Sequence, residues 1–177
     1  NVIRILSGAD GNTISFTPPD IGPLTLDRGR FVELEASTAF RVVGTEALLI
    51  SQFLVGQDYA GISSSEAMGQ GDPSMSLAIP TEQFRESYTI LAPSSYESSF
   101  VNITASADQE VWIDGERVSA WVALAGTDRR IARLPVSAGV HHVESDFPFG
   151  IVVYGFGSYT SYMYPGGLDL RPINPLI

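Results

Sequence analysis

The sequence of 177 residues contains no cysteine and no lysine, so all ten of its basic side chains are arginine. The absence of cysteine excludes disulfides, thiolate catalysis and cysteine-ligated zinc. The absence of lysine excludes Schiff-base chemistry and the lysine of a phosphate-binding loop. No apolar run approaches the roughly 20 residues that a membrane helix requires, so we expect no membrane insertion.

Positive charge is also scarce, because ten arginines stand against twenty acidic residues and the net charge is −10. Such a field repels the phosphates of nucleic acids and of anionic lipid surfaces. We therefore expect neither nucleic acid nor a membrane as a partner. The chain starts at Asn1 without an initiator methionine or a signal peptide, so we expect a piece of a longer protein.

The hydrophobic pattern is that of short β-strands. Phe31–Glu35 alternates apolar and polar residues, and Asp114-Gly115 is typical of a two-residue hairpin turn. Eleven prolines and 17 glycines break most candidate helices, leaving only Ser65–Met68 and Thr81–Glu86 as helical turns. The predicted strands are Val2–Leu6, Thr13–Phe16, Phe31–Glu35, Ala39–Val43, Ala47–Phe53, Tyr88–Leu91, Phe100–Ala105, Glu110–Ile113, Val118–Val122, Ile131–Pro135, His141–Glu144 and Gly150–Phe156. The sequence therefore predicts an all-β fold with almost no helix.

Two pairs of segments resemble each other at nearly equal spacing. Val42–Gly56 resembles Val143–Gly157 at an offset of 101 residues, and Ile3–Asp10 resembles Val101–Asp108 at an offset of 98. Two matches in the same order indicate an internal repeat. We therefore predict tandem β-sandwich modules, two related antiparallel sandwiches. The first covers residues 1–80, including a linker at 57–80, and the second covers residues 81–177.

The repeat predicts an incomplete first module. Tyr88–Ala92 opens the second copy, and its counterpart would lie before Asn1. We therefore expect the first module to lack its opening strand, which leaves Val2–Leu6 with an unpaired sheet edge. A preceding polypeptide segment or the linker would cover that edge.

Few residues are suited to catalysis. His141 and His142 are the only imidazoles, and neighbouring residues of a strand point to opposite faces, so the two cannot bind one metal. We expect one packed histidine and one at the surface. No Gly-x-Ser-x-Gly motif occurs and no pair of carboxylates stands out, so we expect a non-enzyme, with a hydrolase as an alternative.

Two segments have the composition of binding loops. Residues 69–84 are polar and rich in glycine and proline, and we expect an ordered loop between modules in which Asp72 forms an Asx-type turn. Asp72 is also a weak calcium candidate, because calcium requires several oxygens and only one carboxylate is present. No other cofactor is expected.

The second segment, Tyr154–Gly167, alternates aromatic and small residues. Exposed tyrosines offer a flat face and a hydroxyl to a ligand. Alternatively, Tyr154 and Phe156 end a core strand and Tyr159–Tyr164 folds over the sheet edge. Across both segments, the candidate ligand-binding residues are Asp72, Gln83, Tyr159, Tyr162 and Tyr164.

The order and spacing of several motifs resemble a known family. These motifs are Gly71-Asp72-Pro73-Ser74-Met75, Pro80…Glu82-Gln83-Phe84…Tyr88, Trp112-Ile113-Asp114-Gly115, Gly139-Val140-His141-His142-Val143, Pro148-Phe149-Gly150, Val153-Tyr154-Gly155-Phe156 and Ser161-Tyr162…Tyr164-Pro165-Gly166-Gly167. From about Phe31 to Leu170 the chain is similar to the N-terminal domain of IgG-Fc-binding proteins, which also occurs in large bacterial surface proteins. Vertebrate members are secreted mucus proteins that bind the Fc part of IgG.

This resemblance implies a non-catalytic recognition or adhesion module, extracellular or on a cell surface, with a protein or glycan partner. It carries over no ligand-binding residues. A carbohydrate-binding sandwich that uses Trp112, Trp121 or Tyr159–Tyr164 is an alternative and predicts exposed, coplanar rings. A structural spacer of a large surface protein is another.

Overall fold

The computed structural model describes residues 1–18, 21–56, 59, 61 and 71–170. Nearly all regular structure in this part of the chain is β, and the only helical element there is a single 3-10 turn, Thr81–Gln83. No helix among these residues is long and apolar enough to cross a membrane. The predicted all-β fold is confirmed, although the predicted turn Ser65–Met68 lies outside the described residues.

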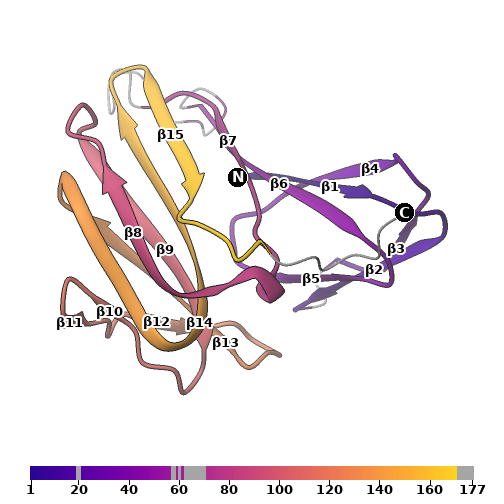
Figure 1. Cartoon of the computed structure of the whole chain (residues 1–177). Coiled ribbons are helices and arrows are strands. Elements are labelled where there is room, and N and C mark those ends of the chain that lie inside the picture. The colour runs from indigo at the N-terminus through magenta and orange to yellow at the C-terminus, as the bar shows by residue number, and fades with distance from the viewer. Residues whose placement is uncertain (19–20, 57–58, 60, 62–70, 171–177) are drawn as a thin grey trace.

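The N-terminal strands form two facing sheets (Figure 1). The first has the order β4-β1-β6-β7, with β4 at Phe31–Glu35, β1 at Val2–Ser7, β6 at Leu48–Leu54 and β7 at Ser74–Leu77. The second has the order β3-β2-β5, with β3 at Leu24–Leu26, β2 at Asn12–Thr17 and β5 at Arg41–Gly44. Ile5, Ile14 and Phe16 are the buried members of the cluster between them.

The first strand does not have the open edge that the repeat predicted. β1 pairs with β4 on one side and with β6 on the other, so the prediction of an unpaired edge at Val2–Leu6 is wrong. The physical reason lies in the alternation of Phe31–Glu35, which makes an antiparallel partner for β1 and places Leu34 opposite Ile3.

The C-terminal strands form one larger sheet built around β14. Its order is β11-β10-β14-β9-β13-β12, and β8 and β15 pair with β14 as well. The strands are β8 Arg85–Ala92, β9 Ser98–Ser106, β10 Trp112–Ile113, β11 Glu116–Arg117, β12 Trp121–Ala123, β13 Arg129–Val136, β14 Gly139–Gly157 and β15 Thr160–Pro165. The segments predicted as His141–Glu144 and Gly150–Phe156 are one strand with a register shift between Glu144 and Phe149.

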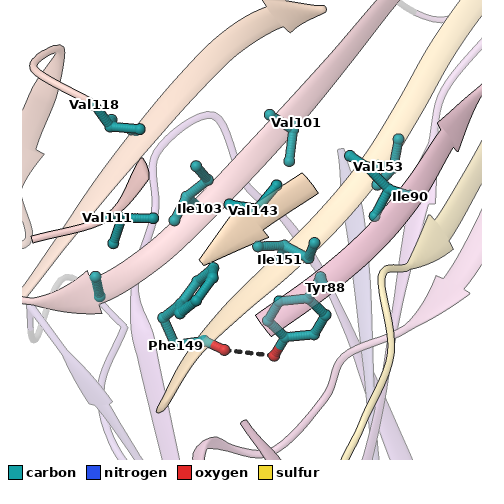
Figure 2. Close-up of a cluster of buried hydrophobic side chains, with 12 residues drawn as sticks. Tyr88, Ile90, Val101, Ile103, Val111, Val118, Val143, Phe149, Ile151 and Val153 are labelled. Atoms are coloured by element: carbon teal, nitrogen blue, oxygen red, sulfur yellow. Dashed lines mark hydrogen bonds between the residues drawn. The ribbon is translucent and has the colours of Figure 1, made fainter. Parts of the chain in front are cut away.

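The C-terminal core is larger than the N-terminal one. Figure 2 shows its side chains converging from β8, β9 and β14, with the Tyr88 hydroxyl donating a hydrogen bond of 2.5 Å to the Phe149 carbonyl. Val101, Ile103, Val143 and Val153 have no solvent exposure. Burial of this apolar surface is the main source of stability for the sheet.

The two groups of strands meet along β7 and β15, which lie side by side (Figure 1). The backbone N–H of Gly71 donates to the Gly157 carbonyl at 2.9 Å, and that of Asp72 donates to the Ser161 hydroxyl at 3.0 Å. The predicted linker 57–80 thus contains β7, while residues 57–58, 60 and 62–70 lie outside the described part. The boundary at residue 80 stays a prediction.

Candidate functional site

Asp72 lies at the junction of β7 and β15, whereas Gln83 lies in the 3-10 turn that follows β7, and both make backbone hydrogen bonds. Asp72 holds the β14–β15 hairpin through its N–H, and the Gln83 carbonyl accepts a hydrogen bond of 2.9 Å from the N–H of Asp169. The Asp72 side chain is exposed. In the described residues no group of three or more histidine or acidic side chains is arranged to hold a metal ion. The calcium site at Asp72 stays a prediction without a ligand cluster to support it.

The three candidate tyrosines do not share one surface. Tyr162 donates to the Ser99 hydroxyl at 2.8 Å and Tyr164 donates to the Leu91 carbonyl at 2.7 Å, and both rings pack against the C-terminal core. Burial raises the pKa of both phenols. Tyr159 is different, because it is 73% exposed at the hairpin tip with a φ of 52°. The five candidates therefore do not converge on a single pocket.

The tryptophans do not form an open platform either. The indole N–H of Trp121 donates to the Val118 carbonyl at 2.9 Å, and the guanidinium of Arg130 lies 4.2 Å from the centre of its ring. Trp112, in β10, is partly buried. A sugar ring would have to displace the arginine to stack on Trp121, which weakens the argument for carbohydrate binding there.

One histidine is buried and hydrogen-bonded within the C-terminal sheet, and the other lies at the surface. His141 is buried between the Asp114 carboxylate, 2.6 Å from Nδ1, and the Ser137 carbonyl, 2.7 Å from Nε2. Burial opposes its charge, yet these two acceptors raise the pKa of His141, and the same pairing lowers the pKa of Asp114. His142 points to the surface near Glu144. Both ring nitrogens of His141 are thus engaged by acceptors, and among the described residues no serine hydroxyl is hydrogen-bonded to it as a nucleophile would be.

The sequence interpretation missed an apolar surface on the N-terminal four-stranded sheet. We call it the outer face, the side of β4-β1-β6-β7 that points away from the core. Its registers place Val2, Arg4, Leu6, Phe31, Glu33, Glu35, Leu49, Ser51, Phe53, Met75 and Leu77 together. Four of them are large apolar side chains that remain exposed, namely Phe31, Leu49, Met75 and Leu77.

Arg4 organises the centre of the outer face. Its Nε and Nη2 donate to one oxygen of Glu33, at 2.9 and 2.6 Å. The guanidinium also lies 4.9 Å from the centre of the Phe31 ring and 5.3 Å from that of Phe53. These contacts hold a cation flat among apolar side chains, where it is partly desolvated.

A shallow groove of about 470 Å³ runs beside Arg4. Its lining includes Glu33, Glu35, Phe53 and Tyr59, and the Tyr59 hydroxyl donates to the Glu35 carboxylate. That hydrogen bond to a negative group raises the pKa of Tyr59. The outer face therefore combines exposed apolar residues with a groove that carries both signs of charge, a composition typical of protein-binding surfaces.

The sequence matches the family described as IgGFc binding protein over residues 1–155. The chain belongs to this family. The match covers every strand of the outer face and ends inside β14, so Tyr162–Gly167 lies beyond the matched residues. The resemblance drawn from the sequence motifs is thus confirmed, with bounds that start and end earlier than expected. No curated protein and no solved structure gives a significant match.

Proposed function

We propose that this chain is a non-catalytic recognition domain that works outside the cell and binds a protein partner through the outer face. The single observation that carries the proposal is the set of exposed apolar side chains around Arg4 on one sheet face. Membership in the IgGFc binding protein family supports a binding role and an extracellular setting. The Fc part of IgG is the first partner to test.

The C-terminal sheet supports this choice by comparison. Met163 in β15 lies opposite Tyr154 of β14, as Met75 in β7 lies opposite Phe53 of β6. Met163 is only 8% exposed, whereas Met75 is 52% exposed. The corresponding position is therefore enclosed in one sheet and open to solvent in the other, and an apolar position that stays open is available to a partner.

The composition of the outer face also fits a binding role. Energetic centres of protein interfaces are enriched in aromatic side chains and arginine, and the outer face presents Phe31 and Phe53 on either side of Arg4. The net charge of −10 favours a partner with a basic surface, because opposite charges attract each other during encounter.

The test measures binding of the full chain to immobilised IgG Fc. We expect Leu49→Glu and Met75→Glu to weaken binding at least about tenfold, since each buries a charge in the apolar contact. The matched control is Val122→Glu, an equally drastic change at a position that is 71% exposed in β12, and we expect it to bind like the unmodified chain. Equal binding by all three variants would refute the outer face as the site.

A glycan array and a chelator separate the alternatives. Binding to a glycan array that is lost on Tyr159→Ala, with no binding to Fc, would indicate carbohydrate recognition at the hairpin tip. Loss of either activity in chelator would support a calcium site at Asp72. Silence in both assays would favour a structural spacer.

A further inference from the structure

The two groups of strands share one pairing scheme. The order β4-β1-β6-β7 in the N-terminal sheet corresponds to β13-β9-β14-β15 in the C-terminal sheet. The registers of β1 with β6 and of β9 with β14 agree at the offsets of 98 and 101 residues seen in the sequence, and the neighbouring strands pair in the same order. Corresponding cross-strand pairs are Ile5–Ile50 and Ile103–Ile151, Ile3–Leu34 and Val101–Leu134, and Phe53–Met75 and Tyr154–Met163.

A buried amide side chain supports the correspondence independently. Asn12 accepts a hydrogen bond of 3.0 Å from the Glu46 N–H and so holds the turn between β5 and β6. Gln109 donates to the Phe147 carbonyl and, at 2.9 Å, to the Ser145 hydroxyl, and so holds the register shift of β14. Both amides are buried, and Glu46 and Phe147 stand at the 101-residue offset. Thus β5 corresponds to the first half of β14, and β6 to its second half.

This correspondence identifies an edge that lacks a partner. The first half of β14 has β10 on one side and β8 on the other, with Val143 opposite Tyr88. β5 has β2 on the side that corresponds to β10, and no other strand of the described residues pairs with it. Thr45 donates to the Thr13 carbonyl, so the alternation of an antiparallel ladder aims the backbone groups of Val42 away from β2.

The core beside this edge is less enclosed than its counterpart. Val143 has no exposure and Ile151 has 4%, but the corresponding Val42 and Ile50 are only partly buried. In the C-terminal core β8 contributes Tyr88, Ile90 and Ala92, all buried. Among the described residues, β2 is the only strand that pairs with β5, and the N-terminal cluster has only Ile5, Ile14 and Phe16 as buried members.

We propose that the edge of β5 binds an extended segment of the β8 type, supplied by polypeptide that adjoins Asn1 in the parent protein. β8 precedes β9 in the chain and β9 corresponds to β1, so the missing strand belongs just before β1. The segment presents a large apolar side chain opposite Val42 and another two residues earlier or later, as Tyr88 and Ile90 do on β14. The β5 edge carries no proline or lysine of the kind that blocks strand addition.

The test restores the strand by fusion. Residues Arg85–Ser98, which run from β8 to the residue before the counterpart of Asn1, are fused in front of Asn1 of the full chain. The matched control carries the same fusion with Tyr88→Asp and Ile90→Asp in the fused copy only. We expect the first fusion to raise the Tm by at least about 5 °C over the control, because two large apolar side chains are buried. Amide hydrogen exchange at Val42 should slow at least about tenfold.

Two results would overturn the proposal. The first is equal Tm and equal exchange in both fusions, which would show that the edge does not accept such a strand. The second is a Val42 amide that is already protected in the unfused chain and becomes exposed in a chain ending at Leu170, which would assign the edge to residues 171–177. The Fc-binding assay is independent of both, so failure here leaves the outer face untouched.

Discussion

Removing the hydroxyl of Tyr88 tests how the C-terminal core is held together. The hydroxyl donates to the Phe149 carbonyl at 2.5 Å and accepts from the Arg85 N–H at 2.9 Å (Figure 2 shows the first of these). Burial raises the pKa of Tyr88, so the phenol stays protonated at neutral pH and remains a donor. Arg85 and Phe149 are the cross-strand pair of β8 and β14 beyond the register shift, and the Tyr88 hydroxyl bridges their backbone groups. Tyr88→Phe therefore removes two hydrogen bonds and keeps the ring.

The expected cost follows from burial. A buried carbonyl left without a donor costs about 1–3 kcal/mol, and the partly buried Arg85 N–H adds about 1 kcal/mol or less. The ring still packs edge-on against Phe149, whose ring centre lies 5.0 Å away, so the apolar contribution is unchanged. We therefore expect Tyr88→Phe to lower the free energy of unfolding by about 1–4 kcal/mol. In a chain of this size that corresponds to a Tm lowered by roughly 2–16 °C.

Tyr164→Phe is the matched comparison. The Tyr164 hydroxyl also bridges backbone groups, the carbonyl and the N–H of Leu91, but it does so at an exposed site where water takes its place. We expect a loss of about 1 kcal/mol or less. The assay is urea unfolding of both variants, followed by circular dichroism and by tyrosine fluorescence. A Tyr88→Phe loss no larger than that of Tyr164→Phe would refute the claim that burial, rather than hydrogen-bond count, sets the cost.

Two further changes have predictable signs. Burial opposes the charge on His141 but its acceptors raise its pKa, and the pairing lowers the pKa of Asp114. The ion pair therefore stabilises the fold fully between pH values of about 4 and 6.5, the ordinary pKa values of aspartate and histidine. This stabilisation is lost as the pH rises through the raised pKa of His141. The urea midpoint should therefore be higher at pH 6 than at pH 8.5, and His141→Gln should reduce that difference; an unchanged difference would contradict the assignment. Gly150→Ala places a Cβ 2.3 Å from the Phe84 ring and should cost about 1–3 kcal/mol in urea unfolding, whereas Gly22→Ala, with nothing within 4 Å, should cost little.

Strand positions were predictable wherever alternation extended over at least four residues. Phe31–Glu35 was predicted with the bounds it has in the structure, and the Asp114-Gly115 turn has the positive φ angles that its sequence requires, 52° and 81°. The strands that the sequence did not indicate are short or atypical. β3 has three residues, and β7 and β15 lie in segments that resemble loops because serine, glycine and proline surround them.

The binding candidates were less predictable for a related reason. Tyr162 and Tyr164 alternate with Ser161 and Met163 because the two tyrosines lie on the face of β15 that packs against the C-terminal core. An exposed row of tyrosines on a strand would show the same alternation in the sequence. A buried row and an exposed row differ only in whether other strands cover that face, and the sequence of the segment does not contain this information. The sequence did contain one indication of the outer face, because Phe31 lies on the same side of its strand as Glu33 and Glu35. An aromatic residue in phase with carboxylates indicates an apolar side chain left in solvent.

The segment Val42–Gly56 shows what sequence similarity preserves in this protein. It aligns without a gap with Val143–Gly157, yet it forms two strands in different sheets, whereas its counterpart lies within one strand. The difference arises at residues 45–47, which connect β5 to β6, and at residues 145–148, where the register of β14 shifts. On both sides of this point the same positions face the core. A buried face requires the same alternation of apolar and polar residues in both segments, while the path of the backbone between the sheets differs.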